Sequence, residues 1–167
     1  MSEHRTMRRT DRELTDPSAL DDVLGRADVL FVAMVDEGEP YVLPFDFGYE
    51  PGPDGGPAGG ALFVHCAEEG RKLDVIAREP RVCFTAEVDH EVVPGTACSW
   101  TAYFRSVVGW GTARLVADRA ERARALERLI EHYSGQPESL PPASADGVAV
   151  IRIDIERVTG KARDRRP

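Results

Sequence analysis

Short stretches of alternating apolar and polar residues, separated by turn-forming segments, recur along most of this chain. The clearest runs from Arg81 to Val88, where apolar side chains occupy every second position from Val82 onward. Alternation with a period of two is typical of a β-strand that buries one face. Six such strands in meander order predict a mainly antiparallel barrel of the α+β class, not a doubly wound parallel sheet. They are expected at residues 29–35, 41–49, 61–66, 81–88, 101–116 and 147–155.

Three flanking helices complete this pattern. Asp16 followed by Pro17 is a strong helix start, because aspartate caps free N–H groups and proline suits the first turn. A short second helix is expected over residues 68–78. The third begins after Asp118 and ends at Gly135, and its apolar residues repeat with the spacing of one helical face, which indicates core packing.

The composition limits the class of protein. With 167 residues, 42% of them apolar and 30% charged, the chain is long enough to form one soluble domain. We expect this domain over residues 14–163, between a polar N-terminal tail (1–13) and a short C-terminal tail (164–167). A net charge of −8 without a dense cationic run argues against nucleic-acid binding.

Cysteine and histidine usage gives no metal or disulfide signal. The three cysteines lack C-x-x-C spacing and the four histidines are scattered, so no metal site is expected. The N-terminus has no hydrophobic signal core, and no apolar run reaches the length of a membrane span. We therefore expect a cytoplasmic protein.

The segment from Phe63 to Asp74 carries the clearest functional signal. An apolar strand leads into a helix whose start contains Gly70, Arg71 and Lys72. Backbone N–H groups, a glycine and two cations at one point are the ingredients of an anion site. A second basic strand, residues 103–111, could close around the same anion. The alternative is an ordinary strand-to-helix connection with solvated basic residues.

A proline interrupts the alternating run from Tyr41 to Tyr49. Pro44 favours an edge or bulged strand, which leaves backbone groups free to meet a ligand, although a simple edge strand accounts for it equally well. No motif supplies an obvious protein nucleophile, and the neighbours His65 and Cys66 point to opposite faces of a strand. If the protein is an enzyme, its chemistry would therefore depend on a bound cofactor.

These segments together resemble a known family. The likeness covers nearly the whole chain in order: residues 7–13, 33–49, 63–74, 81–84, 103–111, 132–135 and 159–163. The chain resembles the flavin-binding split-barrel superfamily that includes pyridoxamine 5′-phosphate oxidase, and within it the nitroimidazole-resistance branch most closely. The resemblance implies a homodimer of six-stranded split barrels, with one FMN in each of two clefts at the subunit interface.

The resemblance also implies a set of cofactor-binding residues. The backbone from residue 43 to 46 would run beside the isoalloxazine ring, and residues 65 and 66 would lie near the ring or ribityl chain. Arg71 and Lys72 would grip the phosphate, provided that Glu68 and Glu69 point away from it. Ser106 stands where the oxidases carry glutamine. The implied cofactor-binding residues are Leu43, Pro44, Phe45, Asp46, His65, Cys66, Arg71, Lys72, Arg105, Ser106 and Val107.

The expected activity is that of an FMN-dependent oxidoreductase. It would pass electrons from NADH or NADPH to a small electron-poor molecule such as a nitroimidazole. His65 would either supply a proton and orient substrate or only line the cleft. Because the chain has no C-terminal Arg-x-His segment, pyridoxamine phosphate oxidation is not expected. The alternatives are a non-catalytic protein that binds flavin, haem or deazaflavin in the same cleft, or an unliganded interaction domain.

Overall fold

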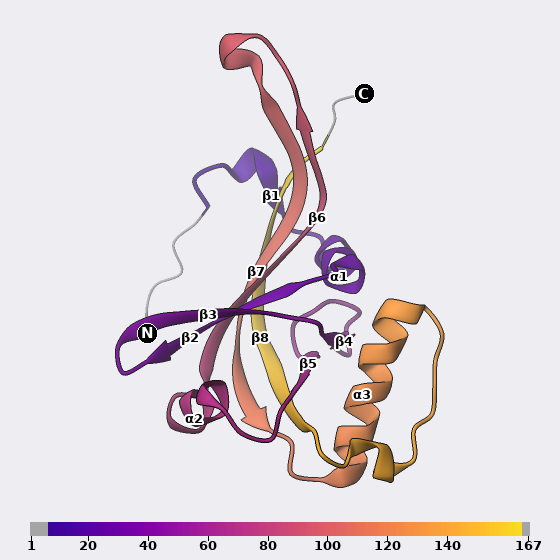
Figure 1. Cartoon of the computed structure of the whole chain (residues 1–167). Helices are drawn as coiled ribbons and strands as arrows, with labels where there is room; N and C mark the ends of the chain where they lie inside the picture. Colours follow the sequence, from indigo (N-terminus) through magenta and orange to yellow (C-terminus); the bar gives the residue numbers. More distant parts are fainter. Residues whose placement is uncertain (1–6, 165–167) are drawn as a thin grey trace.

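The computed structural model describes residues 7–164, which form a curled, open antiparallel sheet with helices around it (Figure 1). Neighbouring strands follow the order β3-β2-β6-β7-β8-β5-β4, and β1 pairs with β8. The strands are β1 (Glu13–Leu14), β2 (Leu30–Asp36), β3 (Glu39–Phe45), β4 (Gly48–Glu50), β5 (Ala61–Cys66), β6 (Arg81–Val93), β7 (Thr101–Leu115) and β8 (Ala149–Arg163). The predicted antiparallel, mainly β architecture is therefore confirmed.

The expectation of six strands is wrong in number, because the described residues contain eight. The short β1 carries no alternation long enough to detect, and the predicted strand 41–49 is divided into β3 and β4 by Asp46 and Phe47. The two pieces lie at opposite ends of the strand order. The sheet is therefore curled, because its two edge strands, β3 and β4, are joined in the chain by only two residues.

Two strands are longer than expected. β6 continues past Val88 through an irregularity in register to Val93, and β8 continues to Arg163. With β7 they extend beyond the body of the protein, where the β6–β7 hairpin forms an arm (Figure 1). Of the expected tails, residues 1–6 and 165–167 lie outside the described residues.

Three α-helices flank the sheet, as expected: α1 (Pro17–Arg26), α2 (Arg71–Arg78) and α3 (Arg119–Ser134). Asp16 caps α1 by accepting a hydrogen bond from the Ser18 N–H, and Asp118 caps α3 in the same way. α2 begins at Arg71, three residues later than predicted. Gly70 has φ 137°, a backbone conformation outside the helical region, so the helix cannot extend back to Glu68. None of the described helices is long and apolar enough to cross a membrane.

Two apolar cores hold these layers together. The larger lies inside the curled sheet and includes Phe47, Phe84 and Val107, all almost fully buried. Gly109 permits the close packing of Phe84, because a Cβ at this position would lie 2.1 Å from the phenylalanine ring. A smaller core, including Phe63 and Ala125, lies between the sheet and α3.

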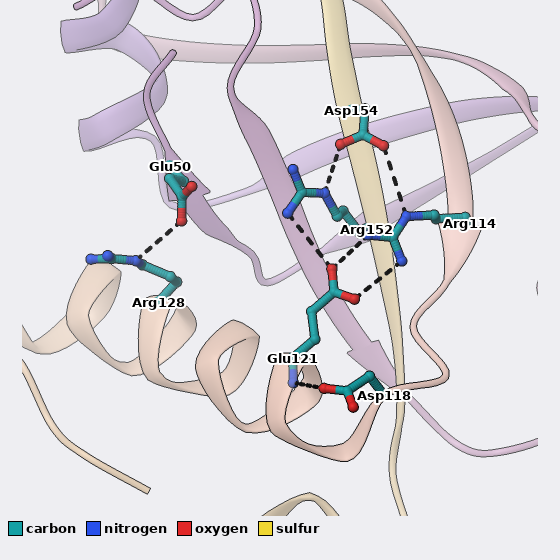
Figure 2. A network of polar contacts seen from close by, with 7 residues as sticks. All are labelled: Glu50, Arg114, Asp118, Glu121, Arg128, Arg152 and Asp154. Carbon is teal, nitrogen blue, oxygen red and sulfur yellow. Dashed lines mark hydrogen bonds and ion pairs between the residues drawn. The ribbon is translucent and has the colours of Figure 1, made fainter. Parts of the chain in front are cut away.

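A polar network ties α3 to the strands beside this smaller core (Figure 2). The Glu121 carboxylate accepts a hydrogen bond from Arg114 Nη2 at 2.6 Å and lies 3.7 Å from Arg152 Nη1. Asp154 in turn accepts a hydrogen bond from Arg152 Nε at 2.6 Å. The Glu121 side chain is only 21% exposed, and these two arginines lie close enough to balance its negative charge.

The substitution Glu121→Gln is expected to lower the free energy of unfolding by about 1–2 kcal/mol, because it leaves two partly buried guanidinium groups short of a counter-charge. Urea unfolding at neutral pH measures the change. Glu131→Gln is the matched control: its partner Arg128 is on the same helix and both groups are more exposed, so the loss should stay below about 0.5 kcal/mol. Equal losses in the two variants would contradict a special role for the network.

Candidate functional site

The start of α2 is joined to the β2–β3 hairpin by an ion-pair cluster. Arg71 Nε donates a hydrogen bond to Asp36 Oδ2 at 2.6 Å, and Arg78 Nη2 donates one to Asp36 Oδ1 at 2.5 Å. The Arg71 guanidinium also lies 4.5 Å from the ring centroid of Tyr41. Because the Asp36 side chain is only 12% exposed while Arg71 is 61% exposed, the carboxylate anchors an arginine that faces solvent.

Lys72 lies near enough to Cys66 for its positive charge to act on the Cys66 thiol. Burial raises the pKa of the Cys66 thiol, and the nearby positive charge of Lys72 opposes this shift only in part. Cys66 packs against the larger core, whereas His65 is exposed, as expected for neighbours on a strand. A thiol that stays protonated and a histidine on the other face do not form a nucleophilic pair.

The predicted ring-binding segment lies at the edge of the sheet. Within the described residues β3 pairs only with β2, which confirms the edge position expected from Pro44. The side chains of Leu43 and Phe45 pack against the larger core, and those of Pro44 and Asp46 are exposed. Proline is tolerated in a ladder where its nitrogen faces away from the neighbouring strand, so the Pro44 carbonyl points to the free edge. An edge of this kind offers backbone groups to a ligand.

The second predicted basic segment, residues 103–111, belongs to β7. Arg105 Nε donates a hydrogen bond to Asp164 at 3.0 Å, and Ser106 faces outward between Glu87 and Lys161 of the flanking strands. Val107 is fully buried, so its side chain belongs to the core and is not available to a ligand.

α2 packs against the far end of β7. Leu73 and Ile76 of the helix line the same small hollow as Ala113 and Leu115. Ser106 is eight residues before Arg114, which is about 25 Å along an extended strand. The two basic segments are therefore well separated within one chain.

Exposed apolar side chains gather on the outward side of the sheet. Phe31 is 46% exposed, Val42 52% and Val108 37%. The strand register places Pro44, Phe31, Thr85 and Val108 side by side in one row. We call the surface made of Phe31, Val42, Pro44 and Val108 the outer apolar face. Ser106 lies on the same side, two residues before Val108.

Two features of this region escaped the sequence interpretation. Residues 29–35 are apolar at every position, which is typical of a strand covered on both faces and would have indicated the outer apolar face. Arg71 and Arg78 are seven residues apart and so share one side of a helix, but nothing in the sequence identifies Asp36 as their common partner.

A hollow of about 660 Å³ lies beside β1. Arg9, Arg12 and Arg163 line it together with Asp11, Glu13 and Asp164, so its charges balance. It contains none of the predicted cofactor-binding residues. Among the described residues, no three histidine, cysteine or acidic side chains are grouped so that they could hold a metal ion.

Comparison with known proteins adds a family to this geometry. A family model described as pyridoxamine 5′-phosphate oxidase matches residues 16–162, most of the chain. The chain belongs to this family. The resemblance inferred from the sequence segments is therefore confirmed at the level of the family.

Solved structures support the same fold. A candidate 5-nitroimidazole antibiotic resistance protein from Bacteroides thetaiotaomicron is 28% identical, with a TM-score of 0.75 over 90% of this chain and 86% of that one. A flavocytochrome from Azotobacter vinelandii is 20% identical, with a TM-score of 0.76 over 100% of this chain and 76% of that one. A FAD- and haem-binding protein from Mycobacterium smegmatis is 20% identical, with a TM-score of 0.71 over 93% and 75%. No curated protein matches the sequence.

The residues at the start of α2 fit the phosphate group expected in such a family member. Arg71 uses Nε for Asp36, and its side chain remains 61% exposed. A Cβ at Gly70 would meet no heavy atom within 4 Å, so the backbone before the helix is open to close approach. Two successive cations, an accessible backbone and a helix start together can hold a dianion.

Proposed function

We propose that the protein is an FMN-dependent oxidoreductase that reduces small electron-poor molecules, nitroimidazoles among them, with electrons from NADH or NADPH. The observation that carries the proposal is the pair Arg71 and Lys72 at the start of α2, beside the edge strand β3. A phosphate held by this pair places the rest of a flavin along an edge that has free backbone groups. The flavin would supply the hydride or electron transfer, which no side chain here can supply.

Each residue of the site has a specific task in this proposal. Arg71 and Lys72 bind the phosphate, and Asp36 holds Arg71 in place. The backbone of residues 43–46 orients the ring, and Cys66 closes the apolar side of the site. His65 is exposed at the end of β5, where it is available to donate a proton to a bound substrate.

The partner in this proposal is a second copy of the chain. The outer apolar face exposes Phe31, Val42 and Val108, which gain stability when covered. A two-fold axis would cover this face with the same face of another copy. The same contact would bring Ser106 and Arg105 of one chain toward the flavin of the other, which their distance from Arg71 within a chain otherwise prevents.

A second candidate is a non-catalytic binding protein of the same fold. Two structural neighbours are named for haem as well as flavin, one as a flavocytochrome and one as a FAD- and haem-binding protein. In this alternative the cleft holds FAD, haem or a deazaflavin without turnover.

The absorption spectrum of the purified full-length protein, repeated after FMN is added and excess ligand is removed, tests the proposal. We expect flavin bands that remain with the protein, and oxidation of NADH or NADPH when a nitroimidazole is supplied. Colourless protein that retains no FMN would contradict the proposal. A haem Soret band, or tightly bound flavin without turnover, would favour the non-catalytic alternative.

A further inference from the structure

The curled sheet is held together at a seam between its two edge strands. β3 and β4 lie at opposite ends of the strand order, yet only Asp46 and Phe47 join them. The last turn of α3 packs against this junction, which lies near β4 in Figure 1. We call residues 46 and 47 the seam. The seam directly follows the segment assigned to the flavin ring.

A tyrosine hydroxyl occupies the place of a sheet hydrogen bond at the seam. β2 and β3 pair Leu30 with Phe45, and continuation of this register would place Asp28 opposite Phe47. Instead, the Tyr133 hydroxyl lies between these two residues. It accepts a hydrogen bond from the Phe47 N–H at 3.1 Å and donates one to the Asp28 carbonyl at 2.7 Å. The hydroxyl oxygen therefore stands between the chain segments that continue β2 and β3. The Phe47 N–H and the Asp28 carbonyl each keep a hydrogen-bond partner.

The neighbouring groups fix this hydroxyl in place. His132 Nε2 donates a hydrogen bond to the Ala27 carbonyl at 2.8 Å, and the His132 ring lies 4.4 Å from that of Phe47, centroid to centroid. Phe47 itself is fully buried. Burial raises the pKa of Tyr133, the hydrogen bond from the Phe47 N–H opposes this in part, and the nearby Asp46 and Asp28 carboxylates raise the pKa further. The hydroxyl stays protonated and can serve as donor and acceptor at once.

We propose that Tyr133 is a positioning residue for the flavin ring, because its hydroxyl sets where β3 leaves the sheet and so fixes the free backbone edge up to Asp46. The inference rests on the proposed function, since it concerns the same site. Tyr133 is 45% exposed and belongs to α3, a helix to which no cofactor residue was assigned. The motif His132-Tyr133-Ser134-Gly135 thereby acquires a role at the site.

The variant Tyr133→Phe tests this role, because it keeps the ring and removes both hydrogen bonds. Affinities for FMN and for riboflavin, which lacks the phosphate, are measured by quenching of flavin fluorescence. We expect both affinities to fall by about fivefold to tenfold, the equivalent of one net hydrogen bond in the oriented edge. The ratio of the two affinities should not change. The visible spectrum of bound FMN should shift, because the ring no longer meets the same backbone groups.

Tyr49→Phe is the matched control. The Tyr49 hydroxyl donates a hydrogen bond to Asp21 at 2.6 Å and ties β4 to α1, away from the ring segment. This variant should bind both flavins within about twofold of the wild type, since the hydrogen bond that it loses lies elsewhere. Thermal unfolding of both variants verifies that each is folded.

Three outcomes would overturn the inference while leaving the proposed function intact. The first is that Tyr133→Phe leaves both flavin affinities unchanged. The second is that Tyr133→Phe weakens FMN alone, which would place the effect at the phosphate. The third is that Tyr49→Phe weakens both flavins as much as Tyr133→Phe does. Wild-type protein that binds neither flavin would instead remove the proposed function itself, and the assignment of Tyr133 with it.

Discussion

Replacing Arg71 and Lys72 together by alanine is expected to weaken FMN binding by about 100- to 1,000-fold, because two charge-assisted contacts to a phosphate are lost at 1.5–2 kcal/mol each. Riboflavin has no phosphate, and its affinity should change by less than about threefold. Calorimetry or fluorescence quenching with the two ligands measures both values. The ratio of the FMN and riboflavin affinities distinguishes loss of the phosphate contacts from a general weakening of the site.

Arg78→Ala provides the control for this experiment. Arg78 belongs to the same helix and bonds the same carboxylate as Arg71, but it is at the opposite end of α2. Its loss should leave the FMN affinity within about threefold of the wild type, since the Asp36–Arg71 contact remains. If Arg78→Ala weakens FMN as much as the double variant does, or if riboflavin binding falls in parallel, the cation pair is not the phosphate site.

If the proposed dimer forms through the outer apolar face, the substitution Val108→Glu is expected to convert it to a monomer of 18.4 kDa. In a two-fold interface each substitution acts twice, so two carboxylates lose water at the apolar contact, and the dimer should weaken by about 1,000-fold or more. Sedimentation velocity or light scattering over a concentration series measures the mass. The same variant should lose FMN, because in the proposed function a second copy completes the site.

Leu115→Glu is the matched control for the interface. Leu115 is on the same strand and is 53% exposed, but it lies beside α2 and not on the outer apolar face. This variant should remain dimeric. A wild-type protein that is monomeric at micromolar concentration, or a Val108→Glu variant that retains one FMN in a monomer, would contradict the shared site.

Local signals in the sequence predicted several elements closely. The strand at residues 61–66 has the expected ends, and the caps Asp16, Asp118 and Gly135 lie where the residue types indicate. Caps and strand alternation depend on neighbours in sequence, which is why they can be predicted without the fold.

The features that the sequence could not reveal depend on distant residues. After Pro44 the apolar residues continue to alternate as far as Tyr49, so nothing local marks the break at the seam, which depends on Tyr133 some 86 residues after Phe47. The partner of Arg71 is likewise 35 residues away, at Asp36. The grouping of Arg71 with Lys72 at a helix start was predictable, but the separation of Ser106 from them depends on the length of β7.

Asp36 also balances charge on the protein when no ligand is bound. Arg71 and Arg78 carry like charges on one side of the helix, and this carboxylate is a counter-ion for both that the chain itself supplies. In the proposed function, an incoming phosphate would therefore share Arg71 with a carboxylate that is already bound to it.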